Sequence, residues 1–286
     1  MKRLAAGLWL VVSALPAAEL PADQIMLRVA ANQDRAQQLR AQYRFHQNVL
    51  VRVQRSNGKL AREEIRDYRV TPTDKGLRRE LLHVSGKVVD GRRVIPFDQT
   101  EFRYKNTDID GEVVSGLIDD LGGTGKHRDS APSESKTRDG IDRDMFPLSS
   151  KAQAGYTFTL KGEEEYRGHH VYRIDFSPKK SGEAPWAGEA LIDKEACQPV
   201  LITTHLATGL PVAVKILLGT DVKQLGFKVT YQKFDDDVWF PVSYGGELRF
   251  RVLFLYARRV SMGLVNSDFE RADVRSTVEF ALPEVQ

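Results

Sequence analysis

The segment that decides the fold is Gly246–Met262 (GELRFRVLFLYARRVSM), which is separated by four residues from a preceding Val-Trp-Phe-Pro step at residues 238–241. The alternation of side chains between two faces along this segment predicts one exceptionally long β-strand. Ordinary strands have about five or six residues, whereas this one, at ~3.3 Å per residue, would extend on the order of 50 Å. One face carries Leu248, Phe250, Val252, Phe254 and Tyr256, and the other adds Leu253, Leu255 and Ala257. Apolar residues on both faces predict a wide, curved sheet.

The rest of the chain predicts one helix followed by many strands. Across Asp23–Gln42, apolar residues such as Ile25, Val29 and Ala36 recur at three, four or seven residue intervals, as in an amphipathic helix. From Tyr43 onward the period is two, and Gly, Asn, Asp and Ser residues separate the strands. We therefore expect a mainly β protein: an antiparallel, strongly curved, open β-barrel of about 10–11 strands with a helical lid.

The individual elements follow from the same patterns. The segments at Gly86–Gly91 and Gly122–Arg143 are predicted as a turn and as a mobile loop, since the second has almost no apolar residues. A short helix is expected at Gly111–Leu121. The predicted strands before the long one are Tyr43–Val53, Leu60–Val70, Leu77–Ser85, Tyr156–Leu160, His169–Ser177, Gly188–Asp193, Val200–His205, Val212–Leu217, Gly226–Phe234 and Val238–Tyr244, with a weaker pattern at Phe97–Tyr104.

The N-terminus predicts export. Lys2 and Arg3 precede an apolar run, and small residues follow at Ala14 and Ala18, which is typical of a secretory signal peptide at residues 1–18. Cleavage after Ala14 or after Ala18 would fit, and a signal anchor is the alternative. We expect residues 19–286 to form a single domain, secreted and located in the periplasm of a Gram-negative bacterium. No cysteine lies near the cleavage sites, so an acylated N-terminal cysteine is not expected.

Composition argues against several classes of protein. Without the signal peptide, 40 basic and 39 acidic residues remain, and no clustering of Lys and Arg with aromatic residues indicates a nucleic-acid partner. Cys197 is the only cysteine, which excludes an internal disulfide. No other stretch of the mature chain reaches the ~20 apolar residues that a membrane span needs.

Motifs for chemistry are incomplete. Gly122–Lys126 resembles a phosphate-binding loop, but Asp120 stands where a Gly is required and His127 where Ser or Thr is required. Asp108–Gly111 resembles the start of a calcium loop without its closing Glu. Gly-x-Ser-x-Gly, His-Glu-x-x-His and Cys-x-x-Cys are all missing. We expect no enzymatic activity, no cofactor and no metal.

The histidines and the cysteine give no clear site. His169 and His170 begin a strand, so their side chains should face opposite ways and not share a metal. His46 and His83 are predicted on neighbouring strands and could meet, which keeps a lipid hydrolase open as a third hypothesis. Cys197 lies in a predicted turn, where an incidental thiol is favoured over a nucleophile.

Several motifs carry a family resemblance. Tyr43-Arg44-Phe45 opens the first strands, Val171–Lys179 (VYRIDFSPK) and Ala190–Lys194 (ALIDK) follow a long polar segment, and Tyr231–Phe234 leads to residues 238–241. In this order, after a signal peptide and a helix, they resemble the LolA/LolB-like periplasmic lipoprotein carrier superfamily of outer-membrane lipoprotein-sorting proteins. The resemblance implies an unclosed β-barrel whose concave apolar face holds acyl chains under helices. The Arg-Pro step of the dedicated carrier is missing at Arg66–Val70, so no lid-locking role is transferred.

The predicted function is non-catalytic binding or transport of lipid or lipoprotein acyl chains. Release would require a moving lid, for which the Asp23–Gln42 helix and the Gly111–Leu121 segment are candidates. The alternative is an envelope sensor or assembly module that binds a protein partner through the same sheet. The side chains expected to line the hydrophobic trough, or else to fill a plain core, are Phe45, Val49, Val51, Tyr172, Ile174, Phe176, Val229, Tyr231, Phe250, Val252 and Phe254.

Overall fold

The computed structural model describes residues 20–73, 76–99, 110–111, 133–135, 146–180, 186–207, 220–234, 237–252 and 256–272. These residues form one large antiparallel sheet with helix α1 (Ala22–Arg40) and the short helix α3 (Ser150–Gln153). The strands are β1 (Tyr43–Arg55), β2 (Leu60–Thr73), β3 (Gly76–Asp90), β4 (Arg93–Gln99), β5 (Ser133–Ser135), β6 (Tyr156–Tyr166), β7 (His169–Pro178), β8 (Trp186–Asp193), β9 (Pro199–Leu206), β10 (Thr220–Lys233), β11 (Trp239–Val252) and β12 (Tyr256–Arg271).

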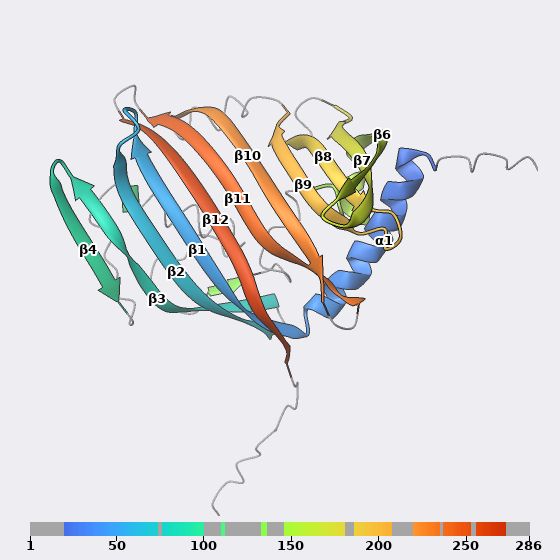
Figure 1. The fold of residues 1–286 in the computed structure, drawn as a ribbon, viewed down its shortest axis with the longest axis horizontal. Helices are drawn as coiled ribbons and strands as arrows, with labels where there is room; N and C mark the ends of the chain where they lie inside the picture. The colour runs from blue at the N-terminus through green and yellow to red at the C-terminus, as the bar shows by residue number, and fades with distance from the viewer. Residues whose placement is uncertain are drawn as a thin grey trace, which may run out of the picture.

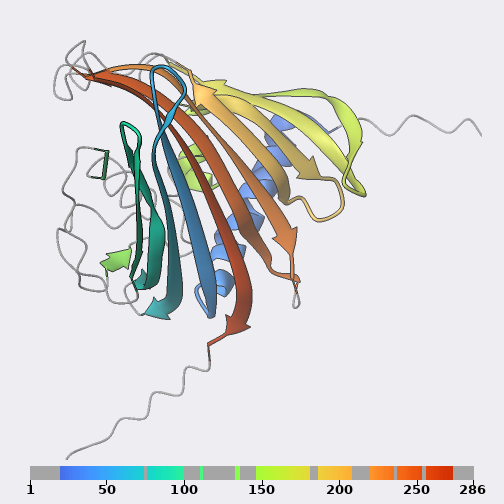
Figure 2. The ribbon, with the colours of Figure 1, turned by 60° about the vertical axis from the view of Figure 1, so that its left-hand side comes forward.

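The sheet consists of two meanders joined in the middle. Its order is β4-β3-β2-β1-β12-β11-β10-β9-β8-β7-β6, with β5 pairing beside β3. The first strand therefore pairs with the last, as Val49 opposite Leu264 illustrates. The sheet curls without closing: β4 and β6 are its two ends, and α1 lies across the concave side (Figures 1 and 2). The predicted open, curved, antiparallel fold with a covering helix is confirmed.

The prediction of one long strand at Gly246–Met262 is wrong. Val252 and Tyr256 pair antiparallel, so the chain reverses between them and the segment supplies the end of β11 and the start of β12. The intervening residues Leu253–Leu255 include no Gly, Pro, Asn or Asp, and the sequence therefore carries no turn signal. Both resulting strands are nevertheless long, with 14 and 16 residues.

Glycines inside strands explain a second error. The turn predicted at Gly86–Gly91 is strand up to Asp90, and the chain turns at Gly91 and Arg92. A Cβ on Gly86 would come 2.1 Å from the Glu63 carbonyl oxygen and 2.7 Å from the ring of Phe97. Gly86 thus allows strands and an aromatic ring to approach closely and does not mark a turn.

Helix α1 matches its sequence pattern closely. Ile25, Met26 and Val29 are buried on the side that faces the sheet, as the helical periodicity predicts. The helix starts after Pro21, with Asp23 in the first turn and Arg40 in the last, an arrangement that suits the helix dipole. The amide of Ala272, just after β12, donates to the carbonyl of Gln42 and ties the two ends of the fold together.

Some predictions fall outside the described residues. These are the signal peptide at residues 1–18, the strand at Val212–Leu217 and nearly all of the helix at Gly111–Leu121. Of the predicted loop at 122–143, only Ser133–Ser135 is described, and it pairs as β5 with Leu77–Arg79 of β3. The division into a signal peptide and one domain stays a prediction.

Candidate ligand-binding face

The sheet face that α1 covers, which we call the inner face, carries one continuous apolar cluster. Strands β1 to β3 and β6 to β12 contribute to it, and α1 adds Ile25, Met26 and Val29. Seven of the predicted trough residues are buried in this cluster, and an eighth, Tyr172, is half-buried against it. The buried seven are Phe45, Val49, Val51, Ile174, Phe176, Val229 and Tyr231. The side chains of Phe250, Val252 and Phe254 lie outside the described part of the chain.

Polar side chains attach α1 to the sheet. Arg40, which is buried, donates from Nη1 to the carbonyl oxygen of Trp239 at 2.7 Å and from Nη2 to Gln33 Oε1 at 3.2 Å. The Gln33 amide in turn donates to Gln198 Oε1. Asn32 Nδ2 contacts the carbonyl oxygens of Ala196 and Cys197 at 3.0 and 3.2 Å. The C-terminal half of α1 is therefore fixed to the β8–β9 turn and to the start of β11.

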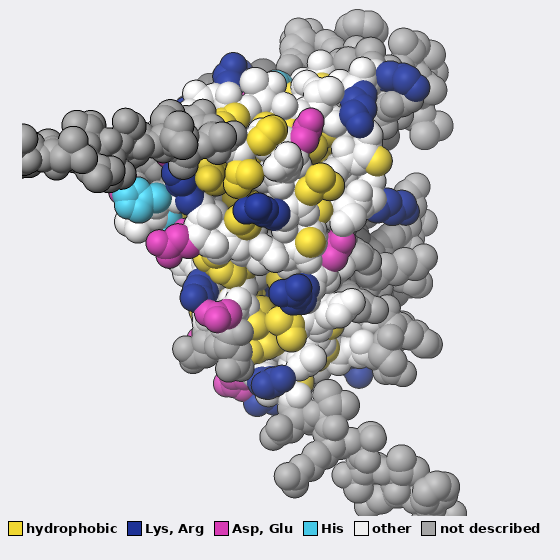
Figure 3. Space-filling view, turned by 90° about the vertical axis from the view of Figure 1, so that its right-hand side faces the viewer, with side chains coloured by type: hydrophobic (Ala, Val, Ile, Leu, Met, Phe, Trp, Pro, Cys, Tyr) yellow, Lys and Arg dark blue, Asp and Glu magenta, His cyan; other side chains and the backbone are white. Residues whose placement is uncertain are grey.

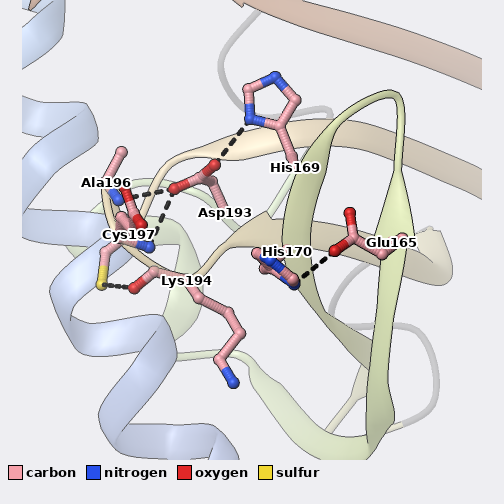
Figure 4. Close-up of polar contacts among 8 residues, drawn as sticks. Glu165, His169, His170, Asp193, Lys194, Ala196 and Cys197 are labelled. Carbon is pink, nitrogen blue, oxygen red and sulfur yellow. Dashed lines mark hydrogen bonds and ion pairs between the residues drawn. The ribbon is translucent and has the colours of Figure 1, made fainter.

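The β8–β9 turn that receives α1 is itself organised by Asp193. Its Oδ1 accepts from the amides of Glu195 and Ala196, and its Oδ2 lies 2.7 Å from His169 Nδ1 (Figure 4). Cys197 adopts φ 48°, a left-handed conformation that closes the turn. The thiol therefore lies in a turn, as expected, and its Sγ lies 3.9 Å from the Lys194 carbonyl oxygen.

The predicted separation of His169 and His170 is confirmed. His170 pairs with Glu165 and His169 with Asp193, so the two rings have different partners (Figure 4). His46 and His83, which the sequence left free to meet, are held apart because β2 lies between their strands. His83 Nε2 instead lies 2.7 Å from Asp98 of β4, and its Nδ1 lies 3.6 Å from Asp67 of β2. Both carboxylates raise the pKa of His83, chiefly through the hydrogen bond with Asp98.

The inner face also holds a buried ionic cluster on β2 that the sequence analysis missed. Glu64 is fully buried, and its two carboxylate oxygens contact Arg62 and Arg66, which are 1% and 4% exposed. The Arg62 guanidinium also lies 5.2 Å from the centre of the Phe97 ring. A sequence signal exists: all three charged residues alternate in phase with Tyr68 and Val70, which are buried.

Within the described ranges, no group of three or more His, Cys, Asp and Glu side chains is arranged to hold a metal ion. The same part of the chain contains no helix with the length and hydropathy of a membrane span.

Comparison with known proteins gives the following likenesses. A family of unknown function (DUF5686) matches residues 141–260, less than half of the chain. No curated protein matches. Among solved structures, a LolA superfamily protein from Nitrosomonas europaea is 11% identical with a TM-score of 0.34, covering 90% of this chain and 96% of its own. A DUF1329 family protein from Desulfovibrio piger is 13% identical with a TM-score of 0.36, covering 89% and 94%.

A chain of the Pseudomonas aeruginosa MucA/MucB complex is 12% identical with a TM-score of 0.24, covering 85% of this chain and 99% of its own. The first of the three structures carries the superfamily name that the sequence resemblance indicated.

Proposed function

We propose that the protein is a non-catalytic binding or carrier protein for lipid or lipoprotein acyl chains in the bacterial cell envelope. The observation that carries this proposal is the continuous apolar cluster on the inner face of a sheet that curls around it without closing. Each methylene that moves from water onto such a face contributes roughly 0.8 kcal/mol. An acyl chain can therefore bind without a dense pattern of polar contacts.

The cover of this face consists of separable parts. Helix α1 adds apolar side chains to the cluster, and its own side-chain hydrogen bonds to the sheet come from the half between Asn32 and Arg40. In the N-terminal half, Gln153 of α3 donates to the carbonyl oxygen of Met26 at 2.7 Å, a contact that opening there would break. Seen from the side of α1 and β6, apolar side chains reach the surface between scattered Lys and Arg side chains (Figure 3). Leu27 on the outer side of α1 is 65% exposed. Movement of α1 at its N-terminal half is the entry route that we propose for the acyl chain.

The test uses the protein purified from its native compartment. Organic extraction is expected to release a bound lipid, and the extracted protein is expected to bind a fluorescent fatty acid saturably. Val265, exposed on the outer face of β12, supplies the control: Val265→Ser should leave binding unchanged. The proposal fails if no lipid is released and the fluorescent fatty acid shows no saturable binding.

A protein partner is the second candidate, and the edge strand β4 favours it. Val94 and Ile95 are 55% and 43% exposed on this strand, whose outer edge has no paired strand among those described. Unpaired strand edges accept an added strand from a partner. Isolation of a stable complex that carries no lipid, and that is lost on Val94→Lys, would support this candidate over lipid binding.

A further inference from the structure

Two polar atoms on the inner face stand out because each is buried without a hydrogen-bond partner among the described residues. They are Tyr244 Oη of β11 and Gln47 Oε1 of β1, in side chains that are 2% and 1% exposed. Buried polar groups in folded proteins are nearly always hydrogen-bonded, to protein, to water or to a ligand. Each of the two atoms is therefore able to take a partner from a ligand, since none of the described residues supplies one.

The orientation of Gln47 is fixed by a chain of hydrogen bonds. The carbonyl oxygen of Pro241 can only accept, so Asn266 presents Nδ2 to it, at 2.9 Å. Asn266 is left with Oδ1, which accepts from Gln47 Nε2 at 3.0 Å. Gln47 must therefore present Oε1 elsewhere. Its unmet requirement is for a hydrogen-bond donor.

Tyr244 has the opposite requirement. Its ring packs against Phe227, with ring centres 5.1 Å apart, inside the apolar cluster. Burial raises the pKa of Tyr244 far above its usual range, so the hydroxyl keeps its proton at any physiological pH. A buried phenol that cannot ionise needs a hydrogen-bond acceptor.

The two groups lie on either side of β12. Tyr244 is opposite Leu264 of this strand, and Gln47 is opposite Asn266, two residues further along. Strand spacing of ~4.8 Å and a rise of ~3.4 Å per residue place the two Cα atoms about 12 Å apart. Both side chains rise from the inner face, with Leu264 and Asn266 of β12 between them, so a single ligand that lies across β12 can reach both.

We propose that this pair binds the uncharged head of an acyl ester that also carries a hydroxyl group. The ester carbonyl accepts from Tyr244, and the hydroxyl donates to Gln47. A carboxylate or a phosphodiester has no proton to donate to Gln47 Oε1, and burying its charge among apolar side chains is costly. This inference rests on the proposed acyl-binding function and adds the chemical class of the ligand.

The test compares two probes with the same acyl chain. 1-Dodecanoylglycerol offers an ester carbonyl and hydroxyls, whereas methyl dodecanoate offers the carbonyl alone. Displacement of a fluorescent fatty acid gives the affinity of each. Tyr244→Phe is expected to weaken both probes about fivefold, the size of one hydrogen bond. Gln47→Met is expected to weaken 1-dodecanoylglycerol about fivefold and to leave methyl dodecanoate unchanged.

The ratio of the two affinities is measured within each variant, so any loss of folded protein cancels. Tyr156→Phe is the matched control, because Tyr156 lies in the same cluster and its hydroxyl is hydrogen-bonded to the backbone of Trp186. That control should lower Tm without changing the affinity of the folded protein for either probe. Tyr244→Phe should leave the Tm of the ligand-free protein unchanged or raise it, because the hydroxyl has no bond to lose.

Three results would overturn the inference. The first is a ratio of the affinities for the two probes that is the same in Gln47→Met as in the wild type. The second is equal affinity of the wild type and Tyr244→Phe for methyl dodecanoate. The third is a loss of Tm in Tyr244→Phe as large as in Tyr156→Phe, which would mean that ordered water already bonds the hydroxyl. If neither probe binds the wild type while the fluorescent fatty acid does, the head-group class is wrong and acyl binding stands. If no acyl probe binds, the proposed function fails as well.

Discussion

At the scale of single residues, the ionic cluster on β2 gives the clearest stability prediction. Glu64→Gln keeps the shape of the side chain but removes the negative charge that contacts Arg62 and Arg66 in a buried site. Breaking a buried ion pair from one side costs about 3–5 kcal/mol. We expect a loss of about 3 kcal/mol in the free energy of unfolding, measured by urea denaturation.

The neighbouring residue supplies the control for this prediction. Glu63 points to the opposite side of β2, is partly exposed and pairs with Arg52 and Lys87. Exposed pairs contribute about 0–1 kcal/mol. Glu63→Gln should therefore cost less than about 1 kcal/mol, and equal losses in the two variants would contradict the assignment of Glu64 to a buried cluster.

His83 predicts a pH dependence with a definite sign. Its pKa is raised in the folded protein, chiefly by the hydrogen bond with Asp98 and then by Asp67. Protonated His83 therefore stabilises the fold fully below its ordinary pKa of about 6.5, and this contribution disappears as pH rises through the raised value. The stability difference between wild type and His83→Gln should shrink from acidic to alkaline pH. In an Asp98→Asn background the trend should weaken; a difference that grows with pH would contradict the assignment.

Sequence reasoning at this scale succeeded where side chains follow the strand period. Phe45, Val49 and Val51 were placed on one face by alternation, and they are buried together. Gln47, Glu64 and Arg66 share that same phase. The sequence does not show, however, which residues will form hydrogen bonds or ion pairs with a polar residue at a buried position. Those partners come from strands that are adjacent only in the folded sheet, as Asn266 is for Gln47.

At the scale of elements, two adjacent glycines in β11 can be substituted in turn, one as the test of close packing and the other as its control. A Cβ on Gly246 would lie 2.6 Å from the ring of Phe227, whereas a Cβ on Gly245 would meet nothing closer than 3.9 Å. Overpacking of this kind typically costs about 1–3 kcal/mol. Gly246→Ala should lose stability within that range in thermal unfolding, and Gly245→Ala should be neutral or slightly stabilising. Equal effects would show that the Phe227 ring is not packed on Gly246.

Helix α1 gives a prediction about local opening. Arg40→Leu removes the contacts with the Trp239 carbonyl and with Gln33, while Arg35→Leu changes an exposed position on the same helix. Hydrogen exchange at the C-terminal turns of α1 should accelerate at least tenfold in the first variant and not in the second. Unchanged protection in Arg40→Leu would mean that apolar packing alone holds the helix.

Helices and strands were predicted best where the sequence has both a regular spacing of apolar residues and turn residues at the end of the element. The helix at Asp23–Gln42 matches the structure closely, and so does the turn between the predicted strands Tyr43–Val53 and Leu60–Val70, where Gly58 adopts φ 80°. The reversal after Val252 was missed because its residues are apolar and resemble strand. At Gly86 the opposite error occurred: a turn was predicted, but Gly86 lies inside β3, where it allows close packing.

At the scale of the whole molecule, pairing of the first and last strands makes folding depend on the complete chain. Strand β12 lies between β1 and β11, so its removal separates the sheet into two parts. A variant that ends at Ala257 should lack a cooperative thermal transition by circular dichroism, whereas one that ends at Ala272 should retain it. A cooperative transition in the shorter variant would contradict this dependence. Sequence alone gave the antiparallel, open architecture but could not reveal this pairing, since the two strands are about 200 residues apart.

The central claim is that the inner face under α1 binds acyl chains. The most direct measurement is titration of the solvent-extracted, full-length protein with a fluorescent fatty acid, in competition with the unlabelled acid. We predict saturable binding at a defined stoichiometry, reversed by the competitor and unaffected by Val265→Ser on the outer face. A signal that rises without saturation, or that the competitor does not displace, would contradict the claim.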